Sequence, residues 1–342
     1  MSGPSVEALA EGVVQGDRAM LGQAITLVES SKPEHRRSAD ELLTLLHGKA
    51  RMAHRIGVTG LPGVGKSTFI DQLGTNLTQE GQRVVVLAID PSSNRTGGSI
   101  LGDKTRMSRL AVDPNAFIRP SPAGKSMGGV TRTTRETMLL CEAAGFDVII
   151  VETVGVGQSE SAVADMVDFF LVLLLPGAGD ELQGLKKGLI ELADLIAINK
   201  ADGDLAPRAA ATAADYRAAL HTLSAPSAGW QPQVLLISSL RNMGLDALWA
   251  AIKRHRELMR DSGGFDAKRR AQAIAWMRAL IDDRLRGIIR DNAQIRRSLE
   301  TLEGEVRAGA KLPAIAAEEI LTLAGFGQSS DAFSRQPAAS SP

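Results

Sequence analysis

The chain has 342 residues, of which 44% are hydrophobic, and its 39 basic and 39 acidic residues give a formal net charge of zero. This balance produces no overall field that would favour nucleic acid or an anionic membrane. The single cysteine, Cys141, excludes internal disulfides and a cysteine-based metal cluster. No apolar run is long enough to cross a bilayer, and residues 1–30 lack a secretion signal. We therefore expect a cytoplasmic protein with neither nucleic acid nor membrane as a partner.

Residues 1–54 have the pattern of a helical extension, in which Ser38 and Glu41 match a capping box. Residues 55–260 alternate short apolar runs with amphipathic segments. Strands are predicted near 55–59, 83–90, 117–119, 147–152, 169–175, 195–199 and 234–238. This alternation predicts an α/β fold, with a mainly parallel sheet covered by helices on both faces.

The first predicted strand runs into the sequence GLPGVGKS at residues 60–67, which fits the P-loop pattern G-x-x-x-x-G-K-[ST]. Its strand–loop–helix setting argues against a glycine-rich turn that matches by chance. Backbone amides of such a loop surround a phosphate, and the start of the helix adds attraction. Lys66 is expected to reach the β- and γ-phosphates, and the Ser67 hydroxyl to bind Mg²⁺. The expected phosphate-binding residues are Gly60, Gly63, Val64, Gly65, Lys66, Ser67 and Thr68.

Further metal and γ-phosphate contacts are expected at the carboxyl ends of neighbouring strands. Glu152 ends the strand at 147–152, and Gly155 follows it, in a variant of the D-x-x-G pattern. Asp90 ends the strand at 83–90, where a turn or helix-capping role is the alternative. Asp103 lies in a glycine-rich polar stretch that suits a switch loop, with a solvated surface aspartate as the alternative. We predict Lys66, Asp103, Glu152 and Gly155 as catalytic, and Ser67, Asp90, Asp103 and Glu152 around the metal.

Val156 occupies the position after Gly155 where Ras-like proteins carry a water-orienting glutamine. Valine cannot orient a water, so intrinsic hydrolysis should be slow unless another residue or a partner protein helps. Gln158 is nearby but two positions late, and the candidate charge stabilisers are the basic residues Lys186, Lys187, Arg95 and Arg106. Each of the basic residues is equally compatible with an ordinary solvated surface position.

The base is predicted from the N-K-x-D box formed by Asn199, Lys200 and Asp202. A carboxylate at Asp202 accepts hydrogen bonds from the ring N–H and exocyclic amine of guanine, whereas adenine would leave it unpaired. Ser238, Ser239 and Leu240, at the end of the last predicted strand, suit a loop that supports the base. These features favour GTP and GDP over adenine nucleotides.

Residues 261–326 follow a helical pattern in which apolar residues recur every three or four positions from Ile274 to Val306. An unbroken helix over 266–307 would be roughly 60 Å long at about 1.5 Å per residue. Its apolar stripe predicts a dimerisation arm and a homodimer. The alternative is a helix that breaks at Gly287 or near Asn292 and folds back. Residues 327–342 are rich in Ser, Ala, Pro and Gln and are expected to be disordered.

Together these motifs closely resemble the MeaB/ArgK family of P-loop GTPases. The resemblance rests on residues 60–68, 88–93, 151–160 and 199–202, and it covers all but the tail. It implies a homodimeric G-protein chaperone that assists an adenosylcobalamin-dependent methylmalonyl-CoA mutase, gating cofactor loading and protecting the enzyme. It also implies Ser67 and Asp103 as Mg²⁺ ligands, and a mobile loop at 177–187.

Two other functions stay open from the sequence. One is an ATP-dependent kinase acting on a small molecule or transport protein, which is the older ArgK label. The other is a nickel-insertion GTPase, which one cysteine and five histidines make a poor fit.

Overall fold

The computed structural model describes residues 4–30, 32–90, 106–122, 127–153, 159–177, 187–223 and 229–326. The chain forms two compact units, residues 1–274 and 275–342. The predicted Asp103 and Gly155 lie outside the described residues, as do Arg95, Val156, Gln158 and Lys186.

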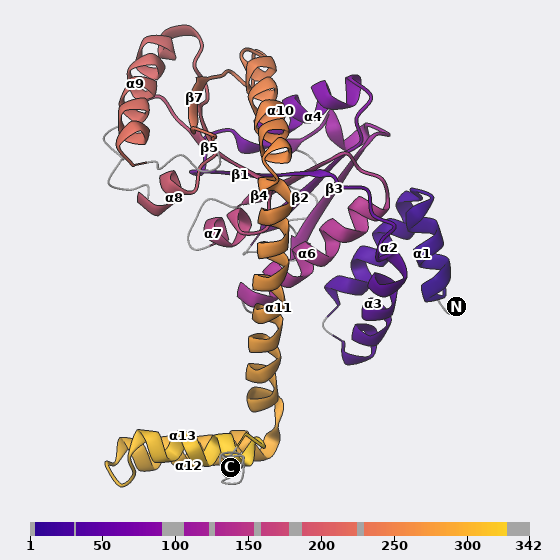
Figure 1. Cartoon of the computed structure of the whole chain (residues 1–342), viewed down its shortest axis with the longest axis vertical. Helices are drawn as coiled ribbons and strands as arrows, with labels where there is room; N and C mark the ends of the chain where they lie inside the picture. The colour runs from indigo at the N-terminus through magenta and orange to yellow at the C-terminus, as the bar shows by residue number, and fades with distance from the viewer. Residues whose placement is uncertain are drawn as a thin grey trace, which may run out of the picture. The chain divides into compact units, whose positions relative to one another are not determined.

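The first unit is built on a seven-stranded sheet with strand order β3-β2-β4-β1-β5-β6-β7, and its neighbouring strands pair in parallel (Figure 1). The strands are β1 (His54–Gly60), β2 (Val84–Asp90), β3 (Ala116–Pro122), β4 (Val148–Thr153), β5 (Phe169–Leu174), β6 (Leu195–Ile198) and β7 (Gln233–Leu236). Each predicted strand overlaps one of these, so the predicted α/β fold with a parallel sheet is confirmed. Because β1 lies between β4 and β5 and all three run in parallel, their carboxyl ends lie side by side at the same end of the sheet.

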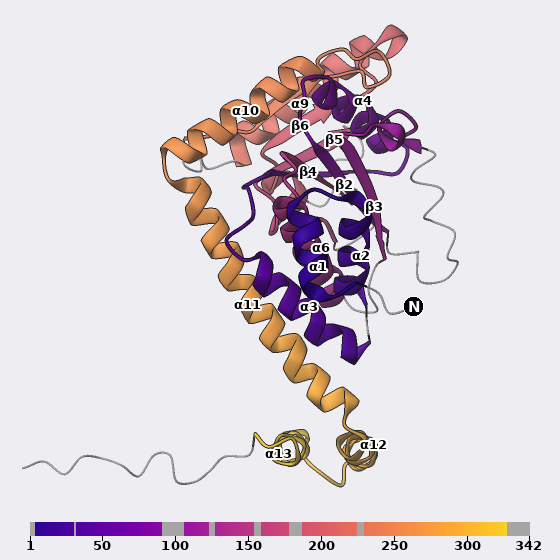
Figure 2. The same ribbon diagram turned by 90° about the vertical axis from the view of Figure 1, so that its right-hand side faces the viewer.

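Helices cover both faces of this sheet. The helices of the first unit are α1 (Val6–Val14), α2 (Arg18–Glu29), α3 (Pro33–Leu46), α4 (Lys66–Gln79), η1 (Leu110–Val112), α6 (Met127–Ala143), α7 (Ser159–Ala164), α8 (Lys187–Glu191), η3 (Gly203–Leu205), α9 (Ala206–Leu223) and α10 (Leu245–Asp261). Figures 1 and 2 agree that α4 and α10 lie on one side of the sheet and α6 on the other.

Alternation along the strands explains this two-layer packing. In β2, Val84 and Val86 belong to the core under α4 and α10, whereas Val85 and Leu87 belong to the core under α6 and α9. Successive strand side chains point to opposite faces, so a strand that is apolar throughout can bury both. The sheet is therefore enclosed, and only its ends are available for a polar site.

The helical N-terminal extension packs beside α6 (Figure 2). Ser5 caps α1 by accepting from the Ala8 amide, and Asp17 caps α2 by accepting from the amides of Ala19 and Met20. The predicted capping box at Ser38 is wrong, because α3 already begins at Pro33. Proline has a fixed φ and no amide hydrogen, so it fits the first turn of a helix, and Ser38 lies one turn inside.

A buried ionic network joins the start of α11 (Gly264–Asp291) to the amino-terminal ends of the strands. The Arg269 guanidinium donates to both carboxylate oxygens of Asp168 at 2.7 and 2.6 Å, to Glu142 at 2.8 Å and to the Ala53 carbonyl at 2.7 Å. Arg55 donates to the same Glu142 through two nitrogens. Burial disfavours the Asp168 carboxylate, but hydrogen bonds and charge from Arg269 outweigh this, so its pKa lies below the usual value. The network connects β1, β5, α6 and α11.

A buried histidine lies close to this network. His54 opens β1, is 1% exposed, and neither ring nitrogen has a hydrogen-bond partner among the described residues. Its ring lies 6.3 Å from the Trp249 ring, centroid to centroid. Burial lowers the pKa of His54 to about 3, against a smaller opposing effect of the Asp168 charge. The imidazole is therefore neutral in the folded protein at neutral pH.

The second unit contains the end of α11, then α12 (Ala293–Arg307) and α13 (Pro313–Leu323). The helix is not continuous to residue 307. It ends at Asp291, and Asn292 caps α12 by accepting from the amides of Gln294 and Ile295. An asparagine side chain competes for backbone amides and favours a helix start, which accounts for a break here rather than at Gly287.

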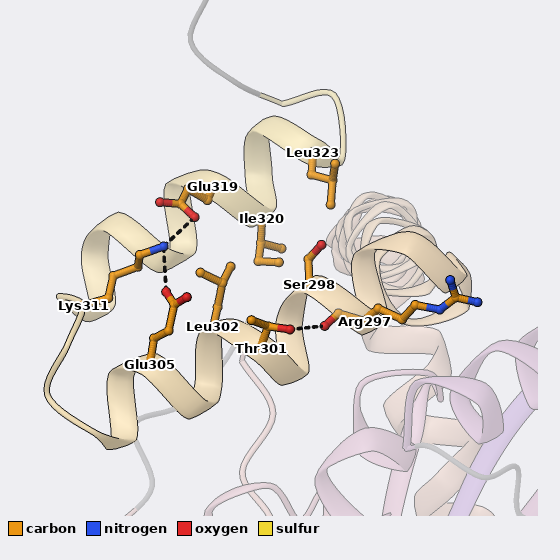
Figure 3. A pocket seen from close by; sticks show the side chains of 9 residues that line it. All are labelled: Arg297, Ser298, Thr301, Leu302, Glu305, Lys311, Glu319, Ile320 and Leu323. Atoms are coloured by element: carbon orange, nitrogen blue, oxygen red, sulfur yellow. Dashed lines mark hydrogen bonds and ion pairs between the residues drawn. The ribbon is translucent and has the colours of Figure 1, made fainter.

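The core of the second unit is small. Its buried residues are Ile295, Leu302, Ala316 and Ile320. A hollow of about 440 Å³ lies between α12 and α13. Figure 3 shows the side chains that line it, among them Lys311, which forms ion pairs with Glu305 and Glu319. A core of so few apolar residues gives the two helices little stability by itself, so we expect them to be stabilised by burying more apolar surface against another surface.

Candidate nucleotide-binding site

The P-loop lies between the end of β1 at Gly60 and the start of α4 at Lys66. Gly65 has φ +96°, and a Cβ there would lie 2.8 Å from Nδ2 of Asn199. A Cβ on Gly60 would lie 2.5 Å from the Leu173 carbonyl oxygen. Both positions thus require glycine, one for its left-handed backbone and both for close approach. The result is a tight turn that directs the amino terminus of α4 into the site.

Lys66 lies within this turn. Its Nζ donates to the Gly60 carbonyl oxygen at 2.7 Å, so the side chain curves back over the loop. Burial lowers the pKa of Lys66, while the negative charges of Glu152 and Glu160 act in the opposite direction. An amine held over a ring of backbone amides at a helix start is the arrangement that binds phosphate groups.

The metal side of the site joins the ends of β1 and β4. Ser67 Oγ donates to Glu152 Oε1 at 3.3 Å, and Glu152 is buried opposite Val58 in the β1–β4 pairing. At the next residue of each strand, the hydroxyls of Thr59 and Thr153 form a hydrogen bond of 2.8 Å with each other. A hydroxyl and a carboxylate oxygen at this spacing fit Mg²⁺, which prefers oxygen donors and keeps several waters. Ser67 and Glu152 are the described residues that would hold the ion.

The other predicted metal and γ-phosphate residues are not described in the same detail. Asp90 closes β2, but its side chain is outside the description, as are Asp103 and Gly155 entirely. In the described part of the chain, no group of three or more His, Cys, Asp or Glu side chains could hold a metal ion. These metal-binding and catalytic assignments stay predictions.

On the base side, Asn199 joins three loops. Its Nδ2 donates to the Val64 carbonyl in the P-loop at 2.8 Å. Its Oδ1 accepts from the Ser239 amide at 3.1 Å and from the Ser239 hydroxyl at 2.8 Å. Asn199 is buried, so every bond it makes is shielded from water. The N-K-x-D box, the P-loop and the 238–240 segment therefore form one rigid unit.

Lys200 and Asp202 complete the base side. Lys200 has φ +59°, an unusual conformation for a side chain of this size, and its Nζ donates to the Gly63 carbonyl at 2.9 Å. Asp202 is partly exposed, and its Oδ2 lies 3.7 Å from Nε of Arg241. The amide of the intervening Ala201 donates to the Ile237 carbonyl at 2.9 Å. An accessible carboxylate beside a lysine stem suits recognition of a purine with two adjacent N–H donors.

Sequence reasoning missed Arg241 and also Asn242, which lies next to it with φ +52°. The two residues follow Leu240 in an exposed stretch that has no motif of its own. Asn242 forms two hydrogen bonds with Asn76 of α4, at 2.8 and 3.3 Å. No sequence signal links Asn76 to Asn242, because the two positions lie 166 residues apart.

A glycine-rich loop at a helix start, a carboxylate on the adjacent strand and an N-K-x-D box bonded to that loop define a P-loop GTPase. Comparison with known families agrees. The model of the family described as methylmalonyl Co-A mutase-associated GTPase MeaB matches residues 21–294, so the chain belongs to the MeaB family.

Individual relatives extend this result. A Caulobacter vibrioides protein named "Putative GTPase" is 56% identical over 322 residues, which cover 94% of this chain and 98% of the relative. The mitochondrial methylmalonic aciduria type A homolog of Mus musculus is 46% identical over 326 residues, covering 92% and 79%. A crystal structure described as an LAO/AO transport system kinase has a TM-score of 0.75 at 38% identity, covering 94% and 98%. The chain is accordingly an enzyme that hydrolyses GTP.

In the described part of the chain, no helix combines the length and apolar character needed to span a bilayer.

Proposed function

We propose that this GTPase is a chaperone for an adenosylcobalamin-dependent methylmalonyl-CoA mutase, gating cofactor loading and protecting the mutase from inactivation. The observation that carries the proposal is the family match over residues 21–294, since that family is named for association with the mutase. The mouse relative, named for methylmalonic aciduria, supports the same metabolic setting.

In the proposed cycle, Lys66 and the P-loop amides bind the phosphates, and Asp202 selects guanine. Ser67 and Glu152 would hold Mg²⁺, with Asp103 and Asp90 as further contacts and the Gly155 amide at the γ-phosphate. Mg²⁺ would offset charge that develops on the phosphates during hydrolysis. The Ser67–Glu152 contact at 3.3 Å supports this arrangement. Intrinsic turnover would be slow because Val156 cannot orient a water, and the mutase would raise it.

The chaperone proposal is tested by single-turnover GTP hydrolysis with and without the mutase, together with spectroscopic detection of adenosylcobalamin transfer. We expect the mutase to raise turnover and GTP to change the transfer rate. Fast hydrolysis that the mutase does not alter, together with transfer that ignores the nucleotide, would contradict the proposal. Ser67→Ala is the hydrolysis-deficient control, because it removes the hydroxyl that would bind the metal.

The described structure of an LAO/AO transport system kinase favours a second candidate, an ATP-dependent phosphotransferase. The two differ at Asp202. In a guanine site, Asp202→Asn exchanges an acceptor for a donor and should shift preference from GTP toward xanthosine triphosphate. An unchanged nucleotide preference, with phosphate transfer from ATP to an added substrate, would support the kinase instead.

We also propose that the protein is a homodimer formed through the arm at residues 261–326. One face of α11 carries Ile274, Met277, Ile281, Leu285 and Ile288, each 37–53% exposed. At 100° per residue this face lies opposite Phe265 and Gln272, which are buried. An exposed apolar stripe of this length needs a covering surface, and an identical stripe on a second copy supplies one.

Light scattering can test the dimer with point variants of the full chain. Met277→Glu combined with Ile281→Glu places two charges in the stripe and should give a monomer. Arg286→Glu changes the charge away from the stripe on the same helix and should leave the dimer intact. A dimer that survives the double change would place the interface elsewhere.

A further inference from the structure

The base-side loop, residues 238–243, is held from two sides. On the inner side Asn199 binds Ser239, as described above. On the outer side the Asn76 and Asn242 amides bond to each other in both directions, at 2.8 and 3.3 Å. Ser238 and Met243 close the loop by exchanging two backbone hydrogen bonds of 2.9 and 3.0 Å. A movement of Asn242 would therefore shift the whole loop.

The outer contact continues along α4. Gln72, one turn before Asn76, donates its Nε2 to Asn76 Oδ1 at 2.8 Å. Gln72 Oε1 accepts from Nη1 of Arg109 at 2.9 Å, and Arg109 Nε donates to Asp71 Oδ2 at 2.9 Å. The other oxygen of Asp71 accepts from the Leu110 amide at 2.9 Å, where η1 begins. We name Asn242, Asn76, Gln72, Arg109 and Asp71 the α4 network.

The inner part of this network is buried, whereas the Asn76–Asn242 contact at its outer end is exposed to solvent. Gln72 and Asp71 are buried, so breaking a bond to either leaves a polar group without water to replace the partner. Residues 72 and 76 are neighbours on one face of the helix, and each fixes the rotamer of the next. Asn242 holds a left-handed backbone that costs conformational energy, and its bonds to Asn76 offset that cost.

The loop held by this network carries Arg241, whose Nε lies 3.7 Å from Oδ2 of Asp202. In the proposed site, the same carboxylate must align with two adjacent donors of guanine. The Arg241 charge lies beyond hydrogen-bond distance of Asp202, so it acts on the carboxylate by attraction and biases where the carboxylate oxygens lie. The loop thus connects α4, which begins with the phosphate-binding Lys66, to the carboxylate that reads the base.

We propose that Asn76 and Asn242 are positioning residues for guanine selectivity, acting through Arg241 and Asp202, and that Gln72 fixes Asn76 for this role. The inference rests on the proposed assignment of Asp202 as the guanine-reading residue. Inosine nucleotides probe it directly, because hypoxanthine keeps the ring N–H and lacks the exocyclic amine. The ratio of the dissociation constants for IDP and GDP therefore reports how well Asp202 is aligned.

The test measures GDP and IDP binding by competition against a fluorescent guanine nucleotide. Asn76→Ala and Asn242→Gly should each lower the GDP-over-IDP preference about fivefold, corresponding to one hydrogen bond. Glycine at 242 keeps the left-handed backbone available, so this variant separates loss of the amide from loss of the turn. The double variant should lose no more than either single change, because both remove the same contact.

Two variants of α4 serve as a matched pair. Gln72→Met removes the support of Asn76 and should lower the preference, while Gln79→Met changes an exposed position of the same helix outside the network and should not. A merely structural role would weaken GDP and IDP binding equally and would leave the ratio unchanged. That result, or additive losses in the double variant, would overturn the proposal.

Asp202→Asn separates failure of this inference from failure of the proposed site. If Asp202→Asn loses guanine preference while Asn76→Ala and Asn242→Gly keep the wild-type ratio, the α4 network has no positioning role. If Asp202→Asn itself binds GDP like the wild type, the base-site assignment is wrong and the inference falls with it.

Discussion

Replacing Arg269 with methionine should destabilise the first unit strongly. Methionine matches much of the length of the side chain but removes four hydrogen bonds, two of them to Asp168. Among the described residues, the Asp168 carboxylate then keeps only the bond of 2.8 Å from the Arg55 amide, whereas Glu142 is still paired with Arg55. Removing one partner of a buried ion pair costs about 3–5 kcal/mol, and the remaining Arg55 contacts argue for the lower end, about 3 kcal/mol.

Urea unfolding followed by far-UV circular dichroism measures this effect. Arg269→Lys keeps a charge but loses the planar fork, so its loss should be intermediate. Adding Asp168→Asn to Arg269→Met should recover part of the stability, since the uncompensated charge is then gone. A free energy of unfolding within about 1 kcal/mol of wild type for Arg269→Met would refute the reasoning, because it would mean that the buried carboxylates do not need this partner.

Three further predictions concern pH and the nucleotide site. The pKa of His54 is about 3 in the folded protein and 6.5 in the unfolded chain, so below pH 6.5 the unfolded chain binds a proton that the folded protein does not. The stability that neutral His54 gives the fold is therefore complete above pH 6.5 and is lost as the pH falls toward 3. The loss should reach about 2 kcal/mol at pH 5 in urea titrations, and His54→Phe should flatten this dependence; an unchanged slope would exclude His54 as its source. Gly65→Ala should abolish binding of fluorescent GDP, because the added Cβ meets Nδ2 of Asn199 at 2.8 Å in a left-handed turn; retained affinity would show that the turn can relax. Ser67→Ala should reduce the dependence of GTP binding on Mg²⁺ by about 1–3 kcal/mol in calorimetry with and without the ion, and an equal Mg²⁺ effect in both proteins would argue against Ser67 as a ligand.

Features that could be predicted from the sequence are those that short segments determine locally. The strands follow from apolar runs between turns, and the P-loop follows from glycines whose spacing fits one backbone path. The hydrogen bond from Asn199 to the P-loop joins positions 135 apart, and the sequence marks both ends by motifs that belong to one nucleotide site.

Other features depend on partners that no local pattern marks. Arg269 meets Asp168 across 101 positions, and Asn242 meets Asn76 across 166, with ordinary surface-type residues at each end. The helix break at Asn292 was open in the sequence, because capping by asparagine competes with an apolar period that continues beyond it. The helix α3 begins at Pro33, whose fixed φ suits a first turn, so Ser38 lies inside the helix and the predicted capping box does not form.

The central position of β1 has a consequence for how the protein comes apart. To expose the amides of β1, both the β4 and the β5 pairings must open, so hydrogen exchange there should approach the rate of global unfolding. Residues 293–323, with few buried apolar side chains, should exchange far sooner in a separated chain. Mild heat or denaturant would thus disrupt binding by the arm while nucleotide affinity persists.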